Sequence, residues 1–408
     1  MALGSSIYAS IFVGLMGVVI GLTPVIAQHF GGKRDVDVGR TYTQGAWLVA
    51  WLSLVGWLAM GFPDAWLVMS HVDDHVASLV GSYLHALMFA LPAALMFRTV
   101  YALNVAVSRP KVTMAINLIG LAFKVPLNYV LIYGEFGLPA LGAPGCGYAT
   151  AIVMWLSCAI ALVALSRDPF YRRFAIRFAW PRWPLQKELL RIGVPTGLSY
   201  IVEVTSFTFM TLLVAGLGTQ ATGGHQIVAN LAALCYMLPL SLAVATSAIV
   251  GQAIGADDAI GARRASRAGL RIAIGVAACV SLGIWLARDL IVSIYTNDVD
   301  VARVAVSLIA FVSVFHVFDA TQGMSSFILR AYKHAVAPML VYTIALWGFG
   351  LVGGWWIAFH AVFGEPLGVY GLWTASTFAL AIAALVLLAW MVRVSRLPLV
   401  PARSSRAA

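Results

Sequence analysis

Charged side chains are scarce in this chain. Lys, Arg, Asp and Glu make up 10% of its 408 residues, whereas about 25% is usual for a soluble globular domain. Hydrophobic residues make up 61%, and the mean hydropathy is +0.91. A shortage of charge on this scale excludes an ordinary water-soluble protein.

Motifs for enzymatic chemistry are also missing. The sequence has no HExxH, no Walker loop and no GxSxG elbow, which argues against ATP hydrolysis and against an enzyme. Its cysteines form no CxxC pair, so we interpret them as small core residues and expect no disulfide, metal centre or cofactor. These cysteines are Cys146, Cys158, Cys235 and Cys279.

Long apolar segments are what the chain has instead. Each is long enough to cross the roughly 30 Å hydrocarbon core of a bilayer as a helix. A barrel would need short strands of alternating polarity, which the sequence lacks. It therefore predicts an all-α polytopic membrane protein. The eleven expected spans are 4–30, 44–68, 77–101, 112–134, 143–166, 188–216, 223–252, 267–296, 301–330, 335–362 and 369–392.

The segments that connect these spans alternate in charge. By the positive-inside rule the basic set is cytoplasmic, which predicts a protein of the cell inner membrane with its basic tail, residues 393–408, in the cytoplasm. The basic set carries Lys33, Arg34, Arg40, Arg109, Lys111, Arg263, Arg264, Arg267, Arg330 and Lys333. The opposite set carries Asp73, Asp74, Glu135, Asp298, Asp300 and Glu365.

Residues 167–191 interleave basic and aromatic side chains, among them Arg177, Arg182, Phe178 and Trp180. Such a mixture also occurs in RNA-binding segments. In a membrane protein it favours an interfacial segment, with rings at headgroup level and cations toward anionic lipid. We interpret it as the linker between two lobes.

An internal repeat supports two lobes. Residues 24–40 align with residues 248–264, and residues 136–151 align with residues 363–376, in the same order. We expect five helices in an N-terminal lobe, residues 1–166, and six in a C-terminal lobe, residues 192–392, whose first helix begins near residue 188. The comparison of the two halves of the repeat predicts that a first helix is missing before Met1, through truncation or a late start codon.

Charged residues inside a membrane are costly, so the few in the spans are functional candidates. Helical spacing places Ser206, Phe207 and Met210 on the face of Glu203. It places Phe315, His316, Gln322 and Ser326 on the face of Asp319. The alternative for both acids is a structural one, in which they are protonated or paired and only hold helices together.

Other polar residues allow two interpretations. Lys124 has no acid in register and either snorkels to the interface or functions, and His316 is a satisfied core histidine or a proton relay to Asp319. We interpret His225, Gln226 and Asn230 as a solvated helix start. We interpret the outer-loop residues His71, Asp73, Asp74 and His75 as a wet loop rather than a metal site.

Several long motifs resemble the multidrug and toxic-compound extrusion family, in its NorM-like branch. Three of them are GLSYIVEVTSFTFMTLLVAGLG (residues 197–218), GHQIVANLAALCYMLPLSLAVATSAIVGQAIG (224–255) and VFDATQGMSSFILRAYKHAVAPM (317–339). The resemblance covers nearly the whole chain in order. It implies two six-helix lobes about a cleft that opens alternately to either side.

The resemblance also implies roles for particular residues. Glu203 and Asp319 match the positions of the cation-coupling acids of the NorM-like branch. The family's carboxylate on the first helix has no counterpart here. We therefore expect a monomeric antiporter that takes up H⁺ or Na⁺ and exports small cationic or amphipathic compounds. The alternatives are a lipid-linked sugar flippase, which would favour a basic cleft, and an inactive membrane protein.

Overall fold

The computed structural model describes residues 2–62, 74–135, 140–362 and 364–398, and in these ranges the chain is helical without a β-strand. Eleven helical segments there are long and apolar enough to cross a membrane. This confirms the predicted all-α polytopic fold. By contact the chain divides into two compact units, Met1–Leu198 and Ser199–Ala408.

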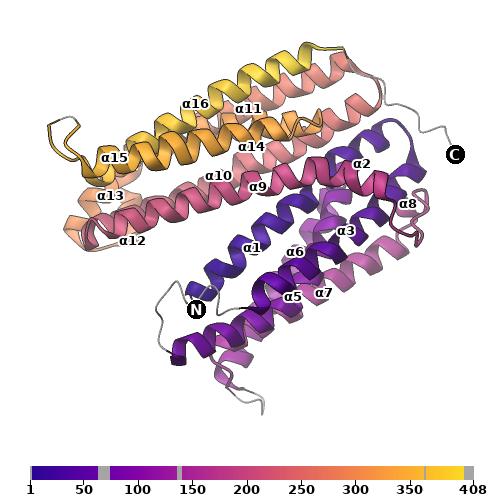
Figure 1. The fold of residues 1–408 in the computed structure, drawn as a ribbon, viewed down its shortest axis with the longest axis horizontal. Coiled ribbons are helices and arrows are strands. Elements are labelled where there is room, and N and C mark those ends of the chain that lie inside the picture. The colour runs from indigo at the N-terminus through magenta and orange to yellow at the C-terminus, as the bar shows by residue number, and fades with distance from the viewer. Residues whose placement is uncertain (1, 63–73, 136–139, 363, 399–408) are drawn as a thin grey trace. The chain divides into compact units, whose positions relative to one another are not determined.

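The helices of the two units are coloured from indigo to yellow along the chain in Figure 1. The N-terminal unit holds α1 (Ala2–Ile20), α2 (Leu22–Gly31), α3 (Asp35–Gly61), α5 (Asp74–Ala106), α6 (Pro110–Tyr133), α7 (Ala143–Arg167), α8 (Pro169–Arg172) and the start of α9 (Trp183–Ala215). The C-terminal unit holds the rest of α9 and α10 (Thr219–Gly255), α11 (Ala259–Leu286), α12 (Arg288–Tyr295), α13 (Val299–Ala331), α14 (Val336–Tyr342), the π-helix η2 (Thr343–Val352), α15 (Gly353–Phe359) and α16 (Gly368–Arg396).

Two predicted boundaries were wrong at the charged ends of helices. Helix α3 begins at Asp35 rather than at residue 44, so Arg40 lies within it, and α11 begins at Ala259 rather than at residue 267. Both helices continue beyond their apolar part. Hydropathy marks only the stretch that tolerates lipid, so it misses a polar helical turn that protrudes from the bilayer.

Four helix ends close on a residue other than glycine with one shared turn geometry, two in each unit. Lys33, Ser108, Asp257 and Lys333 each adopt a positive φ, from 54° to 63°. After each of them, the next N–H donates to the carbonyl five residues back, as at Arg34 N to His29 O and Asp258 N to Ala253 O. This closes a helix in the manner of a Schellman turn. The aligned segments 24–40 and 248–264 thus share a local structure.

Linker residues are held to α3 by hydrogen bonds to the linker backbone. Trp47 Nε1 donates to Ala179 O over 2.8 Å, and Thr43 Oγ1 donates to Arg177 O over 3.1 Å. Arg173 adds an ion pair to Asp35, with Nη2 and Oδ1 2.9 Å apart. The backbone of the linker is therefore fixed to the N-terminal unit.

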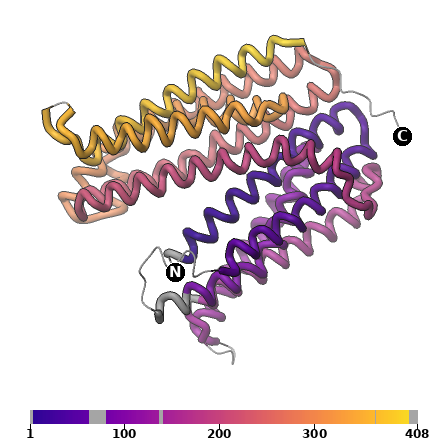
Figure 2. Tube along the Cα trace, viewed as in Figure 1, coloured from indigo at the N-terminus to yellow at the C-terminus, as the bar shows by residue number. Residues whose placement is uncertain are grey.

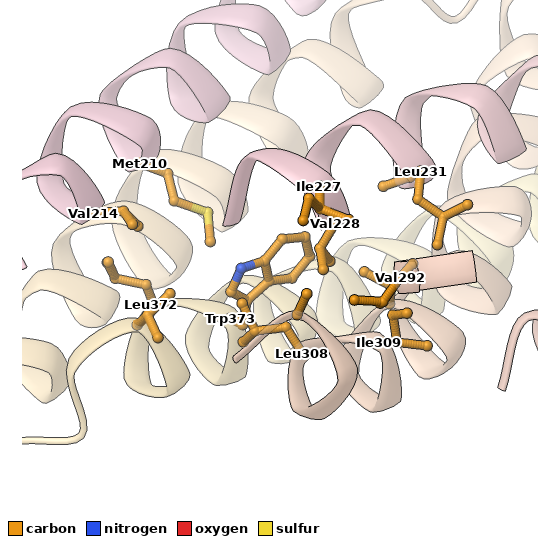
Figure 3. Packing of buried hydrophobic residues seen from close by; sticks show 14 of the residues in the cluster. Met210, Val214, Ile227, Val228, Leu231, Val292, Leu308, Ile309, Leu372 and Trp373 are labelled. Atoms are coloured by element: carbon orange, nitrogen blue, oxygen red, sulfur yellow. The ribbon is translucent and has the colours of Figure 1, made fainter. Parts of the chain in front are cut away.

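In the C-terminal unit, α13 is the central helix and contacts α10, α11 and α16. Figure 3 shows Trp373 of α16 in the middle of a buried cluster, with Met210, Ile227 and Leu308 around it. These side chains come from four different helices, so the ring joins them into one core. Figure 2 follows α14, η2 and α15, residues 336–359, as one continuous tube.

Candidate functional site

A cavity of about 280 Å³ lies inside the C-terminal unit. Helices α9, α10, α13, α14, α16 and η2 all contribute to its wall. Its acidic lining residues are Glu203 of α9 and Asp319 of α13, which are far apart in the sequence. The fold brings their two carboxylates to the wall of one cavity.

The two acids have different surroundings. Asp319 is 8% exposed, and its Oδ1 accepts a hydrogen bond of 2.9 Å from Gln322 Nε2, one turn along the same helix. Glu203 is half-buried, and within the described part of the chain it makes neither a hydrogen bond nor an ion pair. Its carboxylate is therefore the one with free capacity to bind a ligand.

Aromatic side chains surround the acids. Phe207 and Phe315 line the cavity together with Tyr200, Tyr236 and Tyr342. Tyr236 is close enough to both acids to interact electrostatically with each of them. A ring presents its negative π-face to a cation, so the wall is suited to positively charged groups.

The structure places most of the predicted site residues on this wall. Ser206, Phe207, Met210, Phe315 and Gln322 all line the cavity.

His316 does not line it, and is buried at 1% exposure. At about 100° per residue, Phe315 and Gln322 lean to one side of Asp319 and His316 leans to the other. His316 and Gln322 are each three residues from Asp319, but they lie on opposite sides of it around the helix. His316 therefore lies outside the cavity wall.

Sequence reasoning missed three tyrosines of the wall, two of them from other helices. Tyr200, Tyr236 and Tyr342 line the cavity but have no charge that marks them in an apolar span. The π-helix also contributes Leu346 and Gly350. Ser206 Oγ donates to Leu346 O over 3.3 Å, which joins α9 to the widened turns of η2. π-helical turns are frequent at functional sites, and the glycine-rich run around them was the available signal.

The predicted solvated helix start was wrong for one of its three members. His225 is fully buried, whereas Gln226 and Asn230 are exposed. The His225 Nε2 lies 3.0 Å from Thr211 Oγ1, and its ring stacks on Phe207 with centroids 6.1 Å apart. Its side chain points into the helical bundle because its position around α10 faces Thr211 and Phe207 of α9.

The remaining candidates lie away from the cavity. Lys124 is half-buried on α6 of the N-terminal unit. The outer loop that we interpret as solvated lies outside the described residues at His71 and Asp73, as do the side chains of Asp74 and His75. In the described ranges, no three His, Cys, Asp or Glu residues are grouped as metal ligands, and all four cysteines are free.

Comparison with known proteins places the chain in a family. The MatE family model matches residues 1–130 and 195–356. The "probable multidrug resistance protein NorM" of Aromatoleum aromaticum is 41% identical over 97% of this chain and 86% of its own length. The Neisseria meningitidis protein of the same name is 34% identical over 95% of this chain and 84% of its own.

A solved structure has the same fold. The crystal structure of MATE in the bent conformation superposes with a TM-score of 0.86, at 18% identity, over 97% of this chain and 86% of its own. The family consists of multi-pass membrane transporters rather than enzymes, as the sequence predicted. On the family match and the 41% identity together, the chain belongs to the MatE family.

Proposed function

We propose that this protein is a cation-coupled antiporter that exports small cationic or amphipathic organic compounds by alternating access. The observation that carries the proposal is the convergence of Glu203 and Asp319 on one cavity inside an apolar bundle. Its relatives bear the name multidrug resistance protein, which agrees with export of several compounds.

Coupling follows from mutual exclusion at the two acids. A coupling cation, H⁺ or Na⁺, neutralises the carboxylates and so removes their attraction for a cationic substrate. One cation moving down a potential of 100 mV supplies roughly 2.3 kcal/mol, and one unit of pH gradient adds about 1.4 kcal/mol. The absence of known ATP-binding motifs agrees with such a gradient as the energy source.

Substrate selection follows from the rest of the wall. Phe207, Phe315 and Tyr236 offer flat π-faces, and Met210 offers a flexible apolar contact. Such side chains adapt to different organic cations rather than to one shape. A volume of about 280 Å³ is near the lower end for small-molecule sites, so in this conformation the cavity suits an ion or a compact cationic group.

A sugar-lipid flippase is less well supported by this cavity. Pyrophosphate binding needs basic side chains, and the described lining residues include two acids but neither Lys nor Arg. We further propose that the protein works as a monomer in the inner membrane. The distribution of its basic loops favours a C-terminus in the cytoplasm. Protease access to a C-terminal tag in right-side-out and inverted vesicles tests that orientation.

Transport by reconstituted vesicles tests the proposed function. The protein is reconstituted, a fluorescent cationic dye is loaded, and a Na⁺ gradient or a pH gradient is imposed separately. Wild-type protein should move the dye under at least one gradient. Glu203→Gln and Asp319→Asn should each reduce gradient-driven efflux at least about tenfold.

Asp300→Asn is the matched control, because Asp300 is an exposed acid on the same helix as Asp319 and pairs with Arg303. It should transport like wild type. Wild-type efflux by both cavity variants would overturn the role of the acids. Dye movement that ignores both gradients would overturn antiport, and no movement at all would support an inactive protein.

A further inference from the structure

Arg330, near the end of α13, is a buried cation without a hydrogen-bonded partner for part of its guanidinium. Its side chain is 5% exposed, and both Nε and Nη1 are enclosed without a hydrogen bond. The ring centroids of Phe327 and Tyr200 lie 4.9 and 5.4 Å from its Cζ. Ring contacts stabilise the charge but do not satisfy the N–H groups. Such a cation needs an anion in at least one state of the protein.

Glu203 is the acid within reach. Tyr200, whose ring contacts Arg330, lines the cavity, and Glu203 follows it by one turn on the same face of α9. The charges of Glu203 and Arg330 are close enough to interact, yet no ion pair joins them in this conformation. Two opposite charges thus lie near one another, and neither has a charged partner in contact.

Asp319 is differently placed. It lies on the same helix as Arg330 but eleven residues earlier, about 16 Å away along the axis at the usual rise. It already accepts a hydrogen bond from Gln322. Arg330 contacts the ring of Tyr200, and Glu203 lies one turn from Tyr200, so Glu203 is the nearer of the two acids. No rotamer can join Arg330 to Asp319.

We propose that Arg330 is an internal counter-ion for Glu203. It pairs with the carboxylate when no exchangeable cation is bound, and a bound cation displaces it toward the position seen here. This inference rests on the proposed cation site at Glu203 and assigns Arg330 as its positioning residue. The guanidinium keeps the empty carboxylate neutralised and weakens cation binding enough for release.

Thermal unfolding in detergent without sodium tests the pairing apart from transport. Glu203→Gln should lower the unfolding midpoint, because Arg330 then has no anion. Arg330→Met should lower it too, because Glu203 loses its counter-ion. The double variant should unfold at a higher temperature than Glu203→Gln alone, since it leaves no unbalanced charge. Additive losses in the double variant would overturn the pairing.

Two controls separate pairing from general damage. Adding Arg330→Met to Asp319→Asn should give no rescue, because Asp319 lies out of reach. Arg263→Met removes another arginine of the C-terminal unit, whose Nε donates to Ser395 O over 3.0 Å, and it should not rescue Glu203→Gln. If Arg330→Met alone does not fold, Arg330→Lys keeps the charge and should fold, and the double variant still decides the question.

Cation binding gives the second test. Sodium chloride is titrated at fixed pH, and pH is titrated separately without sodium, with intrinsic fluorescence as the signal. Removing a like charge that interacts with the Glu203 carboxylate should tighten cation binding roughly tenfold in Arg330→Met. Arg330→Lys and Arg263→Met should stay near wild type. The other ionisable groups around Glu203 are Asp319 of α13 and the tyrosines Tyr200, Tyr236 and Tyr342.

The Glu203→Gln background makes the result specific. There, Arg330→Met should leave cation binding unchanged, because the carboxylate on which Arg330 acts is gone. Unchanged affinity in Arg330→Met, or the same tightening in the Glu203→Gln background, would overturn the inference. Absence of cation binding in wild-type protein would instead count against the proposed function, whereas the unfolding rescue would still test the pair.

Discussion

Gln322 donates a hydrogen bond of 2.9 Å from Nε2 to Asp319 Oδ1, and both residues line the cavity of the C-terminal unit. The Gln322 Oε1 is enclosed without a partner. The amide is therefore held by one bond to the acid, and its oxygen is left without a partner. Asp319 is thus fixed in position, in contrast to Glu203.

Gln322→Leu should reduce gradient-driven efflux several-fold and lower stability by about 1–3 kcal/mol, because Asp319 then lies buried without its donor. Efflux and thermal unfolding of the same preparation measure the two effects. Gln220→Leu is the control, since Gln220 bonds an exposed acid, Asp300, over 3.3 Å. Equal effects of the two substitutions would show that the Gln322 bond has no special importance.

Gly197→Ala should destabilise the protein by about 1–3 kcal/mol through overpacking. A Cβ at Gly197 would lie 2.5 Å from Gly14 O, at a crossing of α9 over α1. Gly275→Ala is the matched control, because a Cβ there meets nothing within 4 Å. It should be neutral or stabilise α11 by about 0.5–1 kcal/mol. Thermal midpoints in detergent distinguish the two, and equal midpoints would refute the close crossing.

Asp168→Asn should lower the thermal midpoint at neutral pH, and the difference from wild type should vanish in acid. The backbone N–H of Phe170 donates a hydrogen bond to the Asp168 carboxylate, and Arg109 forms an ion pair of 2.6 Å with the same carboxylate. Both contacts, and the hydrogen bond from Phe170 most of all, hold the pKa of Asp168 below its usual value.

Because the native pKa is lowered, the carboxylate stabilises the fold above the ordinary pKa of about 3.9, and this contribution is lost as pH falls through the native value. Unfolding midpoints measured from pH 7 to pH 3 trace it. Asp37→Asn, in an exposed pair of 3.4 Å with Arg40, should change little. A difference that persists in acid would contradict the assignment.

Replacing Arg177, Arg182 and Lys187 by Gln should weaken stabilisation by anionic lipid, by about 1 kcal/mol for each cation near the surface. All three are exposed, beside the rings of Phe178 and Trp180, which are 76% and 73% exposed. Thermal midpoints in nanodiscs with and without phosphatidylglycerol measure this gain.

Arg173→Gln serves as the control for the linker, because it breaks the ion pair with Asp35 that holds the segment to α3. Loss of this ion pair should lower the thermal midpoint equally in nanodiscs with and without phosphatidylglycerol. If the triple variant keeps the full gain from phosphatidylglycerol, the linker cations do not contact the lipid surface.

The sequence by itself determined the number of spans, the helical fold and the two acids of the site. These features can be predicted from the sequence because a helix that crosses lipid must be long and apolar. Charged residues such as Glu203 and Asp319 therefore stand out within their spans. The internal repeat between residues 24–40 and 248–264 was also visible in the sequence. Both copies close a helix with the same turn, at Lys33 and at Asp257. These signals lie within single helices and need no knowledge of packing.

The tertiary structure decided which helices share a cavity. Tyr236, Tyr342 and Leu346 come to the acids from three further helical segments, and no local pattern in an apolar span records which neighbour a residue will face. His316 and His225 were misplaced for the same reason, since rotation about the helix and the packing of the next helix set burial. From the sequence we interpreted Arg330 as a charge in a cytoplasmic loop, but the fold encloses it beside Tyr200. The sequence could not show this, because side-chain partners on different helices are fixed only when the helices pack.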